Sequence, residues 1–187
     1  DNFSLNLKKS LFMAKATLAG GCFGCTETLF ARLDGVLEVV SGYTDGHIKN
    51  PAYREVCTGR TGHAECIQLE YNPEKISFVS LLEVFFDTHD PTTLNRQGAD
   101  VGTQYRSGIY YHDETQKTAA EALIDALAKE KKFNDPIVTE IKAFDVFYPA
   151  EVEHKDYYNL NSNQPYCAAV ISPKVQKLLR KHASKLK

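Results

Sequence analysis

The sequence has no long hydrophobic run, no excess of either charge and no internal repeat. A helix needs about 20 consecutive apolar residues to cross a bilayer, so the sequence offers no candidate membrane span. Its formal net charge of −2 gives no electrostatic reason to expect nucleic acid or an anionic membrane as a partner. We therefore expect one globular protein that acts on a small molecule or a peptide.

Methionine is scarce, and Met13 is the only one in the chain. Because the residues before it are polar and show no pattern, we expect 1–14 to be a flexible N-terminal extension and 15–187 to form a single catalytic domain. The apolar residues 11–14 do not make a secretory signal, since Lys15 ends them at once. At 43% hydrophobic residues, the domain can bury its own core.

Cysteine is present in an odd number, which argues against a disulfide framework. A chain of 187 residues does not need such a framework for stability, so any disulfide is expected to be transient. We therefore expect a reducing compartment, the cytoplasm. The five cysteines are Cys22, Cys25, Cys57, Cys66 and Cys167.

Hydrophobic periodicity alternates between strand and helix patterns. It predicts strands at 16–19, 36–43, 65–71, 108–111 and 137–148, and helices at 26–33, 78–87, 113–132 and 173–185. Ser77 and Asp113 are the expected N-caps. The long loops 44–62 and 88–107 are expected to carry function. This order predicts an α/β protein of the α+β type: a two-layer sandwich with a mixed sheet and a ferredoxin-like core.

The stretch from Gly20 to Glu27 predicts a sharp turn between a strand and a helix, with Cys22 at the start of the helix. Unpaired N–H groups and the positive end of the helix dipole favour an anion there. We therefore expect a lowered pKa for the Cys22 thiol and a partly formed thiolate. The alternative is a small buried cysteine that only packs.

The two long loops supply polar partners for such a thiol. Glu65 stands where the first loop enters a strand, and partial burial there would raise its pKa and make it a proton donor. Tyr53 and Tyr105 can donate O–H hydrogen bonds to a developing oxyanion, and Asp100 can order these donors. The alternatives are a solvated charge for Glu65, ordinary packing for the tyrosines and a turn-forming role for Asp100.

Five motifs in order together resemble the A-class peptide methionine sulfoxide reductases, and the match runs from about Lys15 to Lys181. The motifs are Gly21-Cys22-Phe23 followed by Glu27, NPAYREVCTG at 50–59, TGHAE at 61–65, HDPT at 89–92 and GTQYRS at 102–107. A single motif of this kind is weak, whereas five in the same order are specific.

The resemblance implies that Cys22 attacks the sulfoxide sulfur of free or peptide-bound methionine sulfoxide in its S form. It assigns Glu65 as the acid that protonates the oxygen, with Tyr53, Tyr105 and Asp100 as the polar network around it. Methionine leaves and Cys22 becomes a sulfenic acid, which condenses with a second thiol. Thioredoxin then reduces the disulfide. The resemblance implies no metal and no other cofactor, and we expect a monomer.

The resolving thiol and the methyl pocket also follow from the resemblance. Cys167 lies in the C-terminal segment where family members commonly keep the resolving thiol, so it is the first choice, with Cys25 second. Cys57 and Cys66 are expected to be buried packing groups. Phe23 and residue 24 would form the pocket for the substrate methyl group, although Gly24 stands where the family has tryptophan.

Two other readings of the cysteines stay open. Cys22 and Cys25, between a strand and a helix, could form the dithiol centre of a thioredoxin-like oxidoreductase. A structural zinc module could use both of them with two of Cys57, Cys66 and His63, although the spacing is unusual for zinc. Glu151 and His154 could mimic a helical metal pair, but a solvated helix face is the simpler interpretation of their spacing.

Overall fold

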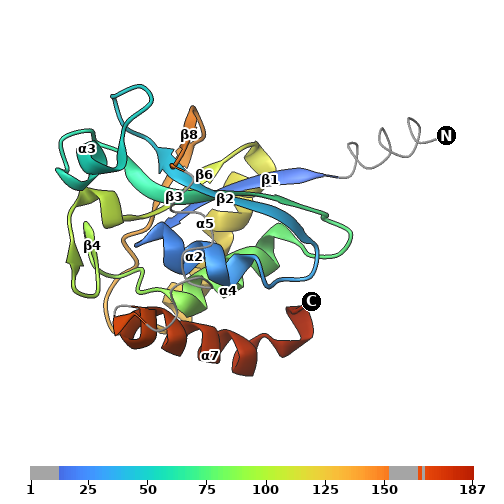
Figure 1. The fold of residues 1–187 in the computed structure, drawn as a ribbon. Coiled ribbons are helices and arrows are strands. Elements are labelled where there is room, and N and C mark those ends of the chain that lie inside the picture. The colour runs from blue at the N-terminus through green and yellow to red at the C-terminus, as the bar shows by residue number, and fades with distance from the viewer. Residues whose placement is uncertain (1–12, 152–163, 166) are drawn as a thin grey trace.

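The computed structural model describes residues 13–151, 164–165 and 167–187, and in them one six-stranded sheet has the order β7-β6-β1-β3-β2-β8 (Figure 1). Its four central strands pair only antiparallel with one another. The edge strand β7 pairs parallel with β6, and β8 pairs antiparallel with β2. The sheet is therefore mixed, as predicted. The strands are β1 (Ala14–Gly20), β2 (Val36–Thr44), β3 (Ala64–Tyr71), β6 (Ser107–Tyr111), β7 (Glu140–Ala143) and β8 (Phe147–Pro149).

Four main helices complete the domain: α2 (Phe23–Phe30), α4 (Phe78–Thr88), α5 (Glu114–Lys129) and α7 (Ser172–Lys181). Helices α2 and α4 lie below the sheet in Figure 1, and α7 packs along both of them on the outer side. The run β1-α2-β2-β3-α4-β6, with the strand order β6-β1-β3-β2, is the ferredoxin-like arrangement. The predicted core topology is confirmed.

The helices begin where local side-chain chemistry allows them to begin. Ser77 Oγ accepts a hydrogen bond from the Ser80 N–H at 3.0 Å, and Asp113 Oδ1 accepts one from the Gln116 N–H at 2.8 Å. Both N-caps are confirmed.

The core lies between the sheet and the helices, where each fully buried large side chain contributes about 1.5–3 kcal/mol. Its largest members include Leu18, Phe30, Leu69, Leu82, Phe85 and Phe86.

The single strand predicted for 137–148 is wrong, because this segment forms β7 and β8 on opposite edges of the sheet. One straight strand cannot pair with both edges, so the chain must cross the end of the sheet between them. Two contacts hold this crossing. The Phe144 N–H donates to the Tyr111 carbonyl at 2.9 Å, and Thr44 Oγ1 donates to the Val146 carbonyl at 2.7 Å.

Short elements fill the two long loops: α3 (Tyr53–Cys57) in the first, and β4 (Arg96–Gln97), β5 (Asp100–Val101) and η1 (Thr103–Tyr105) in the second. Figure 1 shows α3 and β4 at the end of the sheet where β1 ends and β3 begins. Strand β1 begins at Ala14, and residues 1–12 lie outside the described residues. No helix in the described ranges is long and apolar enough to cross a membrane.

Candidate active site

Cys22 lies between β1 and α2, as the sequence predicts. Gly21 has a positive φ of 92°, a conformation that favours glycine, and it turns the chain so that Cys22 becomes the N-cap of α2. The Cys22 carbonyl accepts the Cys25 N–H at 3.1 Å and the Thr26 N–H at 3.4 Å. The half-buried thiol therefore stands at the first turn of a helix, one turn from Cys25.

The predicted lowering of the Cys22 pKa is wrong for the free protein. The pKa of the Cys22 thiol is raised well above its usual value, first by the hydrogen bond to the Cys25 side chain and next by burial. The backbone N–H groups of Gly24 and Cys25 act in the predicted direction and lower the pKa, but they are outweighed. Cys22 is therefore a thiol at neutral pH in the free protein.

Glu65 lies close to this thiol, near the start of β3, and is only 2% exposed. Burial raises the pKa of its carboxyl well above the usual value, and the charges of Cys22 and Asp100 add to the effect. The Phe23 N–H donates a hydrogen bond to the carboxyl and opposes this shift. Glu65 Oε2 is buried and has no hydrogen-bond partner among the described residues. The raised pKa predicted for Glu65 is confirmed.

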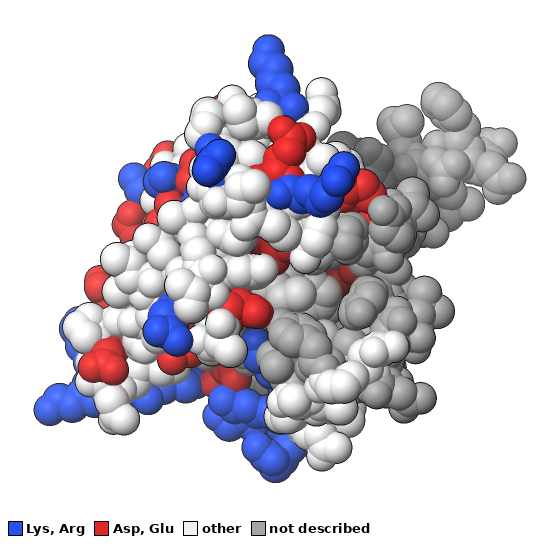
Figure 2. All heavy atoms as spheres, turned by 60° about the vertical axis from the view of Figure 1, so that its left-hand side comes forward, with Lys and Arg blue, Asp and Glu red and all other residues white. Residues whose placement is uncertain are grey.

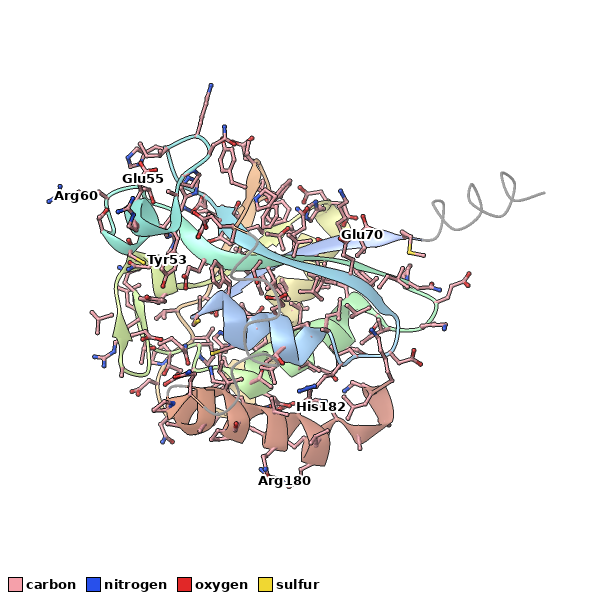
Figure 3. All side chains as sticks on the ribbon, viewed as in Figure 1. Tyr53, Glu55, Arg60, Glu70, Arg180 and His182 are labelled. Carbon is pink, nitrogen blue, oxygen red and sulfur yellow. The ribbon has the colours of Figure 1, made fainter. Side chains whose placement is uncertain are left out.

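Tyr53 and Tyr105 reach the same place from two loops, and both are half-buried. In Figure 3, Tyr53 lies on the side of α3 that faces α2, whereas Arg60 points away from the molecule. Burial is the main cause that raises the pKa of each phenol, and the Glu65 carboxylate raises both further. Asp100, in β5, raises the pKa of Tyr105 and of Glu65. The two loops thus bring Tyr53, Tyr105 and Asp100 close to Glu65, which itself lies close to Cys22.

Phe23 forms the apolar side of the site. Its ring is buried against Tyr43 and Tyr53, with ring centroids 5.7 Å and 6.3 Å away. At Gly24, a Cβ would lie 3.8 Å from Cys22 Sγ, with no other described atom within 4 Å apart from the adjacent residues and the backbone of the helix itself. Residue 24 therefore points its side chain toward the thiol.

The remaining cysteines differ in their environment. Cys25 is buried and Cys66 is buried, the latter as predicted. Cys57 is exposed, so its predicted burial is wrong: it ends the single-turn helix α3, and its thiol hydrogen-bonds with the Tyr53 side chain four residues earlier. Cys167 begins the π-helix η3 (Cys167–Ile171), but its side chain lies outside the described residues.

Sequence reasoning missed two further members of the site. Glu151 follows β8, where its Oε1 accepts the Tyr53 N–H at 2.8 Å and its Oε2 accepts the Tyr43 hydroxyl at 3.4 Å. Tyr43 is fully buried and stands opposite Glu65 across β2 and β3. Neither residue carries a local signal, since their pairing joins positions 108 apart in the chain.

The zinc arrangement finds no support in the geometry. The described ranges contain no group of three or more His, Cys, Asp or Glu side chains arranged to hold a metal. His63 Nδ1 accepts the Gly46 N–H at 3.1 Å, and His63 Nε2 lies 2.6 Å from the Ile48 carbonyl, so both ring nitrogens have partners. Glu151 holds Tyr53 instead of pairing with a metal, and His154 lies outside the described residues.

A cysteine at a helix start, beside a neutral carboxyl and two phenols, fits the site of an enzyme with a cysteine nucleophile. Comparison with known proteins is consistent with this class. The family model for "Peptide methionine sulfoxide reductase" matches residues 14–187. The chain belongs to the peptide methionine sulfoxide reductase family. The relatives described next are of the A class of this family. The comparisons do not favour a thioredoxin-like oxidoreductase.

Two relatives called MsrA illustrate the match. The protein of Saccharolobus solfataricus is 51% identical over 94% of this chain and 98% of its own length. MsrA 1 of Rhodopirellula baltica is 54% identical over 92% of this chain and 88% of its own length.

Solved structures of the same family share the fold. Reduced Mxr1 of Saccharomyces cerevisiae has a TM-score of 0.75 and 34% identity, covering 84% of this chain and 90% of that protein. Methionine sulfoxide reductase A of Corynebacterium diphtheriae has a TM-score of 0.72 and 34% identity, covering 80% of this chain and 76% of that protein. Mxr1 in complex with Trx2 has a TM-score of 0.53 and 26% identity, covering 79% of this chain and 86% of that protein.

Glu65→Gln tests the protonation state of the buried carboxyl. The pKa of Glu65 is higher in the folded protein than in the unfolded chain. Glu65 therefore makes the free energy of unfolding fall as pH rises from its pKa in the unfolded chain to its pKa in the folded protein. A glutamine amide does not titrate. We expect the variant to gain stability relative to the wild type as pH rises, measured by urea unfolding from pH 5 to 8. A difference in stability that is independent of pH would contradict the raised pKa.

Proposed function

We propose that Cys22 reduces the S form of methionine sulfoxide, free or in a peptide, with Glu65 as the proton donor. One observation carries this proposal: the protonated Glu65 carboxyl is buried beside the Cys22 thiol, and its Oε2 lacks a partner among the described residues. A buried polar atom without a partner is costly, so the site favours a ligand that supplies one. The oxygen of a sulfoxide is a strong acceptor and fits this role.

The reaction moves one oxygen atom and two electrons. Glu65 protonates the sulfoxide oxygen, while the Tyr53 and Tyr105 hydroxyls donate hydrogen bonds to it. Asp100 orders these donors. The Cys22 thiol gives its proton to the Glu65 carboxylate, and the Cys22 sulfur bonds to the substrate sulfur. The hydroxyl group then passes from the substrate sulfur to the Cys22 sulfur, while the S–O bond of the substrate and the bond between the two sulfurs break. Methionine leaves reduced, and Cys22 is left oxidised as a sulfenic acid.

The raised pKa of Cys22 fits this sequence of events. In the free protein the thiol keeps its proton and is protected from other oxidants, because the thiolate is the reactive form. Proton transfer from Glu65 places a positive charge on the sulfoxide that Cys22 attacks, and it leaves a carboxylate beside Cys22 that can accept the thiol proton. Substrate binding thus activates the nucleophile, with the help of the backbone N–H groups at the start of α2.

Cys25 is the resolving residue that the contacts support. Its thiol hydrogen-bonds with Cys22 across the first turn of α2, a spacing that allows a disulfide between residues i and i+3. The Cys25 thiol attacks the Cys22 sulfenic acid, forming a disulfide and releasing water. Cys167, the choice implied by the family resemblance, stays the alternative.

A dithiol protein then returns both cysteines to thiols and is itself oxidised. A structure of yeast Mxr1 in complex with Trx2 supports thioredoxin as this partner. The expected cytoplasmic location and the monomeric state stay predictions.

Turnover of the two separate epimers of a methionine sulfoxide peptide, with dithiothreitol as reductant, tests the proposed function. We expect reduction of the S form only, no turnover by Cys22→Ser, and a kcat about 100-fold lower for Glu65→Gln, as for loss of a general acid. Glu70→Gln is the matched control, since Glu70 lies at the other end of the same strand (Figure 3). Reduction of neither epimer, or equal effects of the two substitutions, would refute the proposal.

Separate Cys25→Ser and Cys167→Ser variants decide which thiol resolves. We expect Cys25→Ser to release one equivalent of methionine and then stop when thioredoxin is the reductant, because the sulfenic acid has no thiol partner. Cys167→Ser should continue to turn over. Mass mapping of the oxidised wild type should find a Cys22–Cys25 disulfide, and a Cys22–Cys167 disulfide would reverse the assignment.

Gly24→Trp tests the methyl pocket. An indole at this position would lie next to Cys22 Sγ and form a second apolar wall beside Phe23. Burial of a large side chain against the substrate is worth roughly 1–3 kcal/mol, so we expect kcat/KM for the S form to rise about tenfold, mainly through KM. Gly24→Ser is the control without an aromatic wall. An unchanged kcat/KM would show that other side chains already close the pocket.

A further inference from the structure

The hairpin that carries Asp100 is too short to hold its shape without support. Strands β4 and β5 have two residues each, and Gln97 pairs with Asp100 across them. Residues directly opposite in an antiparallel pair point to the same face. Gln97 and Asp100 therefore share one face of the hairpin, and Arg96 and Val101 share the other. The 67% exposure of Val101 shows that this second face is turned to solvent.

The side chain of Gln97 binds the backbone of the turn that follows α4. Its Oε1 accepts the Asp90 N–H at 2.8 Å, and its Nε2 donates to the Asp90 carbonyl at 2.9 Å. The Gln97 side-chain amide thus pairs with both the N–H and the carbonyl of Asp90, in the way that the backbone of a neighbouring strand would. Asp90 is itself held, because its Oδ1 accepts the Thr92 N–H at 2.9 Å.

The aliphatic part of Gln97 touches the turn that places Cys22. A Cβ added to Gly21 would lie only 2.6 Å from Gln97 Cγ and 2.9 Å from Gln97 Cβ. Such distances are shorter than van der Waals contact, so Gln97 packs directly on the Gly21 backbone. Gln97 therefore connects the turn before Cys22, the turn at Asp90 and the hairpin that carries Asp100.

We propose that Gln97 is a positioning residue that sets the place of Asp100 relative to Cys22 and Glu65. The inference rests on the proposed function of Cys22 and Glu65. Only glutamine satisfies all three contacts. Methionine keeps the aliphatic stem but makes neither hydrogen bond, and glutamate would set a carboxylate oxygen against the Asp90 carbonyl. Asparagine is one methylene shorter and cannot span the same gap.

The position of Asp100 has a measurable effect on Glu65. Among the described residues, the titratable groups that interact with Glu65 are Cys22 from the start of α2, Asp100 from β5, the adjacent Cys66, and Tyr43, Tyr53 and Tyr105 from β2, α3 and η1. Asp100 carries a negative charge and raises the pKa of Glu65. If Asp100 moves away, the pKa of Glu65 falls. Because Glu65 must be protonated to act, the high-pH limb of kcat/KM then moves to lower pH.

Gln97→Met, with Val101→Ala as the matched control, tests the proposal. Val101 lies on the solvent face of the same hairpin and is 67% exposed, and its side chain has no polar group. For the S form of a methionine sulfoxide peptide, we expect Gln97→Met to lower kcat/KM about tenfold, since small displacements in a site cost at least this much. Its high-pH midpoint should move to lower pH. Val101→Ala should match the wild type in kcat/KM and in the high-pH midpoint.

A double-variant comparison separates positioning from a general loss of stability. Asp100→Asn removes the charge, so adding Gln97→Met to it should cause no further shift of the midpoint. An unmoved midpoint in Gln97→Met, or an equal shift in the presence and absence of Asp100, would overturn the proposal. If Gln97→Met does not fold, Gln97→Leu, which also lacks both hydrogen bonds and adds no charge, is judged by the same criteria. Full activity of Glu65→Gln would refute the proposed function, whereas failure of the Gln97 variants alone would leave that function intact.

Discussion

Burial of the Glu65 carboxyl is the constraint on which the site depends. Near the start of β3 the carboxyl is removed from water, and the cost of desolvating a carboxylate keeps the proton on it near neutral pH. Its neighbours are compatible with this state. The Phe23 N–H donates one hydrogen bond to the carboxyl, and the nearby phenols stay protonated. The site therefore holds several hydrogen-bond donors around a place that an acceptor atom can take. In the reaction that we propose, the sulfoxide oxygen takes this position.

The same site balances two opposite effects on its nucleophile. The start of α2 would stabilise a Cys22 thiolate, whereas the neighbouring Cys25 thiol and burial disfavour it, and the second effect is larger in the free protein. The balance leaves the proton on Cys22 in the free protein. In the reaction that we propose, the backbone N–H groups at the start of α2 stabilise the thiolate once substrate is bound.

Tertiary structure outside the site keeps the loops in place at one end of the ferredoxin-like core. Arg106 binds both Asp45, at the end of β2, and Glu140 in β7, and it donates to the Thr103 carbonyl at 2.9 Å. This pairing anchors η1, which carries Tyr105. The face on which these loops lie shows no single-sign charge patch across its centre (Figure 2).

The sequence by itself determined the features that depend on near neighbours in the chain. The N-caps Ser77 and Asp113, the strands at 36–43 and 65–71, and the place of Cys22 at a helix start all follow from local patterns. The two strands in 137–148, the pKa of Cys22 and the contact of Gln97 with Gly21 were decided only by the tertiary structure. Each depends on groups far apart in the chain or on how deeply a group is buried. Local sequence patterns show neither burial nor contacts between distant residues, because both exist only once the chain has packed.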